Sequence, residues 1–322
     1  MKPFTYQRAL SVDTAVAESS ERCRLLAGGI DLLGELKEGL VEADKVVAVT
    51  RIPGLDTIEK KSAGWTIGAN VTVATIAAHA DLARAFPGLA AAARDVASPQ
   101  IRHVSTVAGN LLQHSRCWYY RHRDVTCMKK GGDVCYAREG EHKYHALFTG
   151  GYCISPLVSS LAVALTVLDA SVVVRGRGGE RRLTMAELYA PAWDDHAVHH
   201  AIVPGEMLTA IEIPLAARRS AFVQASEKAS FDWALVSCAV SLELEGGVVR
   251  QARIALGAVS PVPYRDERAE KALVGTRLDE TTADAAAALL LEKAEPLPHN
   301  AYKVPIARAL IKRALLAAAT PG

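Results

Sequence analysis

Four of the six cysteines of this 322-residue chain lie within one segment, residues 113–153. The segment is rich in glycine, lysine, arginine and histidine and has little apolar periodicity, so we do not expect a hydrophobic core alone to order it. Thiols gathered in this way indicate a shared ligand. The four are Cys117, Cys127, Cys135 and Cys153, whereas Cys23 and Cys238 stand alone in apolar surroundings and are predicted to be buried small hydrophobic residues.

Three kinds of crosslink compete for the four thiols. Disulfides suit an even number of cysteines, but the N-terminal residues MKPFTYQRAL contain no apolar stretch of a signal peptide, so we do not expect a secreted protein. A structural zinc site usually shows a C-x2-C pair, and the segment has none. An iron–sulfur cluster requires four thiolates that converge in space. Spacing alone leaves the three readings open.

Two stretches of small residues suggest anion binding. In LAGGIDLL, residues 26–33, a predicted strand ends at Gly28-Gly29 and a short helix follows. Glycines at such a junction let backbone N–H groups approach an anion such as a phosphate. The second stretch, STVAGN, residues 105–110, lies in a predicted irregular region and offers hydroxyl, amide and backbone groups together. Each stretch taken alone is better explained as an ordinary turn or loop.

The periodicity of the rest of the chain predicts an α+β protein with a boundary near residues 216–221. Before it we expect strands at 44–50, 64–69, 171–175 and 207–213, helices at 73–86, 88–96, 157–168 and 183–189, and a polar hairpin turn at 175–182. After it we expect three strands, at 221–227, 235–243 and 248–258, and then helices at 266–274, 279–295 and 301–319. A meander followed by helices is typical of an α+β domain.

Composition excludes several functional classes. The 37 basic residues nearly balance the 35 acidic ones, so nothing indicates a nucleic-acid partner. No run approaches the ~18 apolar residues of a membrane span. We therefore expect a cytoplasmic protein, with export alongside a partner that carries its own signal left open. The pairs Asp194-Asp195 and His199-His200 are predicted to lie in a solvated loop.

Combined, these motifs resemble the flavin subunit of the molybdenum hydroxylase (xanthine dehydrogenase) family. The similarity rests on LAGGIDLL, STVAGN and the C-terminal stretch FDWALVSCAVSLELEGGVVRQARIALGAVSPVPYR. It implies a two-part FAD-binding domain of the vanillyl-alcohol-oxidase/PCMH type at residues 1–215. A C-terminal α+β domain of the CO-dehydrogenase flavoprotein type, with a three-stranded sheet plus helices, would follow at residues 216–322.

The resemblance also implies which residues hold FAD. Its pyrophosphate would lie between the two stretches, and Lys228 of the C-terminal domain would approach the isoalloxazine. The implied residues are Leu26, Ala27, Gly28, Gly29, Ile30, Asp31, Leu32, Ser105, Thr106, Ala108, Gly109, Asn110 and Lys228. Two positions depart from the family pattern. Ile30 replaces the usual threonine and so removes a hydroxyl, and Ala108 replaces a glycine, which requires a negative φ there.

The cysteine segment resembles an insertion found in a subset of these subunits, those of aldehyde oxidoreductases and of 4-hydroxybenzoyl-CoA reductase. There four cysteines bind a [4Fe–4S] cluster, which implies the same role for Cys117, Cys127, Cys135 and Cys153. We further hypothesise that basic residues close to these cysteines form a docking patch for an acidic, ferredoxin-like electron carrier. They are Arg121, Arg123, Lys129 and Lys130.

The implied function is electron transfer within a heterotrimer. A large molybdopterin subunit would oxidise the substrate (an aldehyde, a purine or another heterocycle), and a small subunit would carry two [2Fe–2S] clusters. A 4-hydroxybenzoyl-CoA reductase subunit, with electrons flowing inward, is the alternative within the family. Outside it stand a zinc-stabilised scaffold subunit and a flavin oxidase with its own substrate site.

Overall fold

A small parallel sheet begins the chain in the computed structural model, which describes residues 1–149, 153–195 and 197–320. Its strands β1 (Thr5–Arg8), β3 (Lys45–Ala48) and β2 (Cys23–Leu26) lie in that order. Side chains alternate across a strand, so Val46 packs against α2 (Leu32–Glu38) on one face and Val47 against α1 (Val12–Glu18) on the other. Strand β2 ends at the Gly28-Gly29 loop, on the edge where parallel sheets commonly bind ligands.

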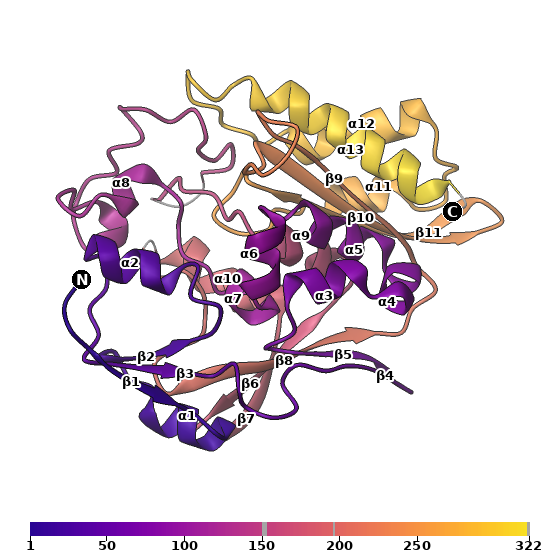
Figure 1. Ribbon diagram of the computed structural model, residues 1–322. Coiled ribbons are helices and arrows are strands. Elements are labelled where there is room, and N and C mark those ends of the chain that lie inside the picture. Colours follow the sequence, from indigo (N-terminus) through magenta and orange to yellow (C-terminus); the bar gives the residue numbers. More distant parts are fainter. Residues whose placement is uncertain (150–152, 196, 321–322) are drawn as a thin grey trace.

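An antiparallel sheet of five strands forms the second part (Figure 1). Its order is β4 (Ile58–Lys61), β5 (Gly64–Gly68), β8 (Glu206–Pro214), β6 (Ser171–Gly176) and β7 (Gly179–Thr184). The β6–β7 hairpin confirms the predicted polar turn. The helices of this part are α3 (Val73–Ala78), α4 (Ala80–Ala85), α5 (Pro87–Asp95), α6 (Pro99–Val104), α7 (Val107–Leu111), α9 (Ser160–Val167) and α10 (Met185–Asp194).

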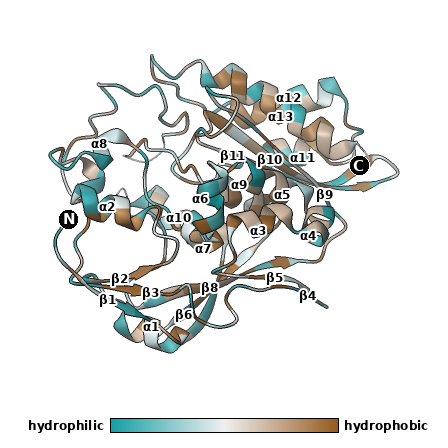
Figure 2. Cartoon of the chain, in the orientation of Figure 1, coloured by the Kyte–Doolittle hydropathy of each residue, from teal (hydrophilic) through white to brown (hydrophobic). Residues whose placement is uncertain are grey.

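The C-terminal part is an antiparallel meander with helices on one face. Strands β9 (Arg219–Ala225), β10 (Val236–Glu245) and β11 (Val248–Gly257) are followed by α11 (Glu267–Leu273), α12 (Glu280–Leu291) and α13 (Lys303–Ala319). Along β10, Val240 packs in the core under these helices and Ala239 in the core of the second part. Both faces of β10 are therefore buried, in keeping with the apolar side chains that make up most of this strand (brown in Figure 2). The predicted three-stranded sheet and the α+β fold are confirmed.

The cysteine segment lies largely outside the sheets (Figure 1). Its described residues, 113–149 and 153, contain α8 (Trp118–Arg121) and one 3₁₀ turn, Met128–Lys130, and otherwise form loops and turns. Hydrogen bonds attach it to the C-terminal part: the His299 N–H donates to His142 Nε2, and the Glu295 N–H donates to the Leu147 carbonyl. These polar contacts order the segment together with apolar packing, in which Ala137, Ala146 and Ile154 lie against Leu297.

Two local predictions are wrong. The predicted helix at 73–86 is broken into α3 and α4, because the His79 ring accepts a hydrogen bond from the Leu82 N–H and so starts a new helix. Residues 98–113 are not irregular but contain α6 and α7, whose first N–H groups bond to the side chains of Ser98 and Thr106. No helix in the described part of the chain has the length and apolar composition to cross a membrane.

Candidate functional site

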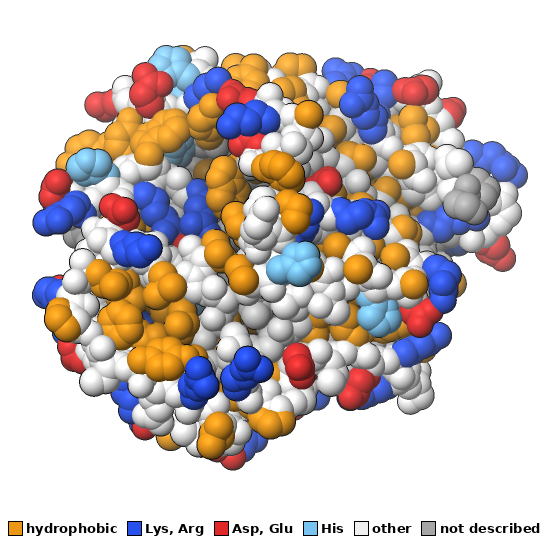
Figure 3. Space-filling view, in the orientation of Figure 1, with side chains coloured by type: hydrophobic (Ala, Val, Ile, Leu, Met, Phe, Trp, Pro, Cys, Tyr) orange, Lys and Arg blue, Asp and Glu red, His pale blue; other side chains and the backbone are white. Residues whose placement is uncertain are grey.

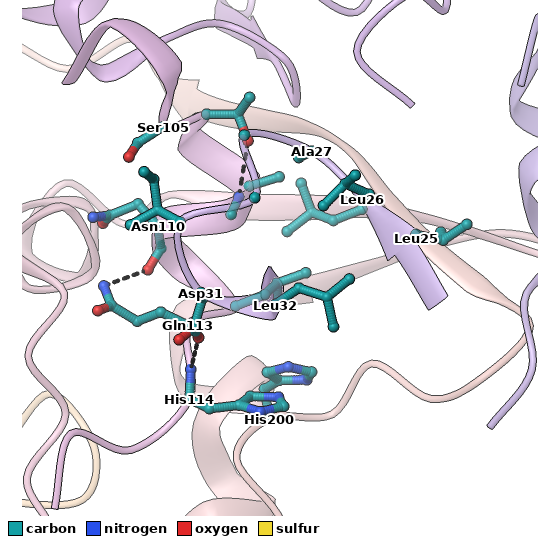
Figure 4. A pocket seen from close by; sticks show the side chains of 18 of the residues that line it. Leu25, Leu26, Ala27, Asp31, Leu32, Ser105, Asn110, Gln113, His114 and His200 are labelled. Atoms are coloured by element: carbon teal, nitrogen blue, oxygen red, sulfur yellow. Dashed lines mark hydrogen bonds between the residues drawn. The ribbon is translucent and has the colours of Figure 1, made fainter. Parts of the chain in front are cut away.

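The two glycine-containing stretches line one cavity of about 380 Å³ (Figure 4). Its volume lies in the range of cofactor pockets. Figure 4 shows Ser105 and the rings of His114 and His200 at opposite ends of the labelled site. Every residue that the sequence assigns to FAD lines this cavity except Lys228: Leu26, Ala27, Gly28, Gly29, Ile30, Asp31, Leu32, Ser105, Thr106, Ala108, Gly109 and Asn110.

Gly28 is the point where the two stretches touch. A Cβ atom at this position would lie 2.0 Å from the carbonyl oxygen of Val104, next to Ser105. Backbone packs directly on backbone here, so no residue with a side chain fits without moving one of the stretches. The following Gly29 has a φ of +77°, a left-handed conformation that glycine adopts without strain. The glycine pair is therefore required by the shape of the cavity wall.

The second stretch is held by its own side chains and by α9. Thr106 Oγ1 accepts a hydrogen bond of 3.1 Å from the Gly109 N–H. The Ser159 hydroxyl donates to Asn110 Oδ1 at 2.6 Å, and the Gln113 amide donates to the Asn110 carbonyl. Ala108 lies inside α7 and therefore has the negative φ that the sequence demanded. These contacts fix the conformation of the stretch at the cavity wall.

The β9–β10 loop closes one side of the cavity. Asp232, Trp233 and Ala234 line it, and the Trp233 ring lies 5.1 Å from the Arg116 guanidinium in a cation–π contact. Lys228 belongs to the same loop but is exposed and does not line the cavity; its N–H donates to Asp232 Oδ2. Contact of Lys228 with a flavin therefore stays a prediction.

The His199-His200 pair is not in a solvated loop, contrary to the sequence prediction. The His199 ring stacks on His114 with 4.1 Å between centroids, and His200 lines the cavity. Burial lowers the pKa of His200 to about 4, and burial also lowers the pKa of His199. Both rings are thus neutral near pH 7. Local sequence carries no signal of this packing, because His114 lies 85 residues before His199 in the chain.

Two carboxylates of the α2 region anchor the start of the cysteine segment. Glu35 is 1% exposed and accepts hydrogen bonds from Tyr120 and His114. Asp31, Glu35 and His114 have ligand atoms within 4.8 Å of one another, a spacing that could suit a metal ion. The guanidinium of Arg121 lies 2.6 Å from Asp31 and 3.7 Å from Glu35. Since Arg121 and Arg116 together balance the charge of the two carboxylates, we interpret the group as an ion-pair network.

The four predicted ligand cysteines line a second, much smaller cavity. They are Cys117, Cys127, Cys135 and Cys153, and Tyr119, Tyr120 and His145 complete its wall. All six cysteines are free thiols, so the disulfide reading finds no support, and Cys23 and Cys238 are buried elsewhere as predicted. The structure therefore brings together thiols that the sequence spreads over 37 positions (117 to 153, counted inclusively).

Hydrogen-bond donors surround the thiols. His145 Nε2 lies 3.2 Å from Cys117 Sγ. Burial raises the pKa of Cys117 to about 12, although the backbone N–H groups of Tyr120 and Tyr119 act in the opposite direction by bonding to its sulfur. Burial raises the pKa of Cys153 as well, opposed by the nearby Lys129. Thiols in this setting become thiolates only when a metal or cluster binds them.

The spacing of the thiols argues against a single zinc ion. A tetrahedral site with Zn–S bonds of about 2.3 Å holds its sulfurs about 3.8 Å apart. Among the described residues, no three of the thiols form a group with sulfurs within 4.8 Å of one another. A cluster separates its ligand sulfurs more widely than one ion does.

The proposed basic docking patch is wrong for two of its four members. Arg121 is only 19% exposed and pairs with Asp31, and Lys129 is part-buried and donates to the Val198 carbonyl. Arg123 is exposed but lies 3.4 Å from Asp124. Lysine and arginine side chains mix with aspartate and glutamate on the face in Figure 3. Arg121 and Lys129 are therefore bound within the protein and are not free to form such a patch.

The parallel sheet, the glycine-lined cavity and the C-terminal meander together define a flavin-binding subunit. The model of the FAD binding domain in molybdopterin dehydrogenase matches residues 2–216, and that of the CO dehydrogenase flavoprotein C-terminal domain matches residues 220–318. The chain belongs to this family, the FAD-binding subunits of molybdenum-containing oxidoreductases.

Individual relatives cover nearly the whole chain. It is 33% identical to the aldehyde oxidoreductase FAD-binding subunit PaoB of Escherichia coli (strain K12), over 96% of both proteins. It is 26% identical to the carbon monoxide dehydrogenase medium chain of Hydrogenophaga pseudoflava, over 98% of this chain and 96% of that one. Among solved structures, CO dehydrogenase from Oligotropha carboxidovorans has a TM-score of 0.78 at 27% identity and covers 99% of this chain and 98% of that chain.

Proposed function

We propose that this chain binds FAD in the larger cavity and a [4Fe–4S] cluster in the cavity lined by Cys117, Cys127, Cys135 and Cys153, here called the cysteine cage. We further propose that it passes electrons between the two cofactors. One observation carries the proposal. Along one extended stretch of backbone, His114 and Arg116 line the FAD cavity while Ser115 and Cys117 line the cysteine cavity. The two cavities therefore share one stretch of backbone, and this proximity supports electron exchange between the ligands that we propose for them.

The residues of the larger cavity suit FAD. The bare backbone at Gly28 and Gly29 and the hydroxyls of Ser105 and Thr106 offer donors for a pyrophosphate without steric obstruction. The apolar wall, which includes Leu26 and Leu32, excludes water from the ligand. Bound FAD supplies the exchange between one-electron and two-electron steps. This chain contributes the orientation of the ligand and the charge around it.

The residues of the cage suit an iron–sulfur cluster. Four thiols supply the ligands, and the Tyr119, Tyr120 and Ser155 N–H groups bond to ligand sulfurs and stabilise them as thiolates. The His145 ring is placed to donate a further hydrogen bond to Cys117, and such hydrogen bonds set the reduction potential. A bound cluster explains why the chain has a long loop beside the proposed flavin site.

We place the chain in a heterotrimer with a large molybdopterin subunit and a small subunit that carries two [2Fe–2S] clusters. The 33% identity to an aldehyde oxidoreductase subunit supports aldehyde oxidation on the large subunit, with electrons leaving through this chain to a ferredoxin-like acceptor. Inward electron flow, as in 4-hydroxybenzoyl-CoA reductase, is the competing assignment. Turnover with benzaldehyde, xanthine and 4-hydroxybenzoyl-CoA by the complex co-expressed from neighbouring genes separates these substrates.

The direct test is cofactor stoichiometry of the anaerobically purified complex. Flavin, iron, acid-labile sulfide and zinc are assayed for the wild type, for Cys135→Ser and for the matched control Cys238→Ala, whose fully buried thiol lines neither cavity. We expect one FAD per chain, and four fewer iron and sulfide in Cys135→Ser than in the wild type and the control. Zinc in place of iron and sulfide in the cage would overturn the cluster assignment, and absence of flavin would overturn the FAD assignment.

A further inference from the structure

The first residue of α13, Lys303, is a fully buried lysine. Its ammonium donates hydrogen bonds to three backbone carbonyls, those of Tyr144 at 2.9 Å, His145 at 3.0 Å and Ala258 at 2.9 Å. Among the described residues no carboxylate pairs with it, and burial is the cause that lowers its pKa, to about 7. Carbonyl dipoles alone leave a buried positive charge without a counter-ion.

One residue, His145, connects Lys303 with the cysteine cage. His145, whose carbonyl accepts from Lys303, also lines the cysteine cavity, and its ring nitrogen lies 3.2 Å from Cys117 Sγ. Asn300, one turn before Lys303 and equally buried, donates to the carbonyls of His145 and Ala146. The C-terminal part thus contacts the wall of the cysteine cage through the side-chain amide of Asn300 and the ammonium group of Lys303.

We propose that Lys303 is a second buried countercharge of the cysteine cage, in addition to Lys129, and that it raises the reduction potential of the cluster that the cage holds. This inference rests on the proposed function. Four thiolates give a [4Fe–4S] centre a net negative charge, and reduction by one electron adds another negative charge. A protonated lysine in a medium of low dielectric constant favours the reduced state, because its attraction to the added negative charge is weakly screened.

A competing role is purely mechanical, since Lys303 also holds the backbone of residues 144–145 in place. Two variants separate the roles. Lys303→Gln removes the charge and keeps N–H donors for the carbonyls, whereas Lys303→Met removes both. The matched control is Lys312→Met, which removes a charge from the solvent side of the same helix, where Lys312 pairs with Glu280.

The measurement is a redox titration of the complete complex at fixed pH, followed by the electron paramagnetic resonance of the reduced cluster, with iron, sulfide and FAD assayed on the same samples. We expect the midpoint potential to become more negative in both Lys303 variants and to stay at the wild-type value in Lys312→Met. Loss of iron and sulfide from Lys303→Gln with normal FAD content and thermal stability supports the same conclusion, because it shows that the cage requires the charge.

Two results would overturn the inference. One is a Lys303→Gln protein with full iron content and the wild-type potential. The other is loss of FAD, stability and iron together in Lys303→Gln, which would assign a mechanical role to the lysine. Failure of the proposed function is recognised separately, since it would leave the wild type without cage iron and sulfide. If Lys303→Met does not fold, Lys303→Gln alone decides between the two roles.

Discussion

Asp31 and Arg121 form an ion pair of 2.6 Å that joins the first glycine stretch to the cysteine segment, 90 residues further along the chain. Their side chains are 18% and 19% exposed. Arg116 approaches the same carboxylate at 2.9 Å, and the His114 N–H donates to its second oxygen at 2.7 Å. Burial raises the pKa of Asp31, but Arg116, this N–H and Arg121 outweigh it and lower the pKa below its usual value. One carboxylate thus connects the two proposed cofactor sites.

Asp31→Asn tests whether this carboxylate couples the sites. The substitution keeps the size of the side chain and leaves two largely buried arginines without their shared partner, which typically costs about 3 kcal/mol. We expect that loss in the free energy of unfolding by urea denaturation. We also expect FAD and iron content to fall together, because the segment that carries Cys117 is attached to the FAD cavity through Asp31.

The control for this variant is Glu245→Gln, which removes a carboxylate from an exposed pair with Arg250. Exposed pairs contribute about 0–1 kcal/mol, so stability and cofactor content should stay near wild type. If Asp31→Asn lost FAD but kept its full iron content, the two sites would be independent and the coupling would be refuted.

Gly28→Ala tests the contact between the two glycine-containing stretches. The new Cβ would meet the Val104 carbonyl oxygen at 2.0 Å, so one stretch must move away from the other. We expect FAD to bind at least about tenfold more weakly, which corresponds to about 1.4 kcal/mol. Fluorescence titration of the apo-protein with FAD measures this change.

Gly34→Ala is the matched control for the glycine test. Gly34 lies inside α2 on the same side of the site, and nothing lies within 4 Å of a Cβ built there. Alanine in a helix interior is favoured over glycine by roughly 0.5–1 kcal/mol, so this variant should bind FAD normally and be slightly more stable. Equal FAD affinity in the two alanine variants would show that the close approach at Gly28 is not needed for binding.

The parts of the site that the sequence predicted are those encoded over a few consecutive residues. A strand, a glycine pair and a helix follow one another directly at residues 23–38, so their geometry is local and readable. The C-terminal meander was predicted for the same reason, since apolar runs separated by Glu245-Gly246-Gly247 require a hairpin. The cysteines were found because four thiols in one segment are conspicuous in composition.

The parts that the sequence could not predict depend on contacts between distant segments. Glu35 looks like an exposed residue of a short amphipathic helix, yet Tyr120 and His114 bury it. Lys303 looks like an ordinary basic residue at the start of a helix. Arg121 was assigned to a surface patch because its partner Asp31 cannot be recognised from spacing. In each case a charge is neutralised by a group whose proximity only the fold establishes.

The pH dependence of stability tests the packing of the histidines around the larger cavity. Burial lowers the pKa of His200 to about 4, against about 6.5 in the unfolded chain, so below pH 6.5 the unfolded state binds the proton more readily. Stability should therefore fall as the pH decreases from 6.5 toward 4. For a single group with this shift, the loss between pH 7 and pH 5 is at most about 2 kcal/mol.

His200→Gln should remove this share of the pH dependence, because glutamine does not titrate, and urea denaturation at pH 7 and pH 5 measures it. His103→Gln is the control, since His103 is exposed on α6 and its removal should leave the difference between the two pH values unchanged. Part of the dependence should persist in His200→Gln, because burial lowers the pKa of His199 in the same direction. An undiminished dependence in His200→Gln would mean that the His200 ring is hydrated, and the packing of this end of the cavity would have to be revised.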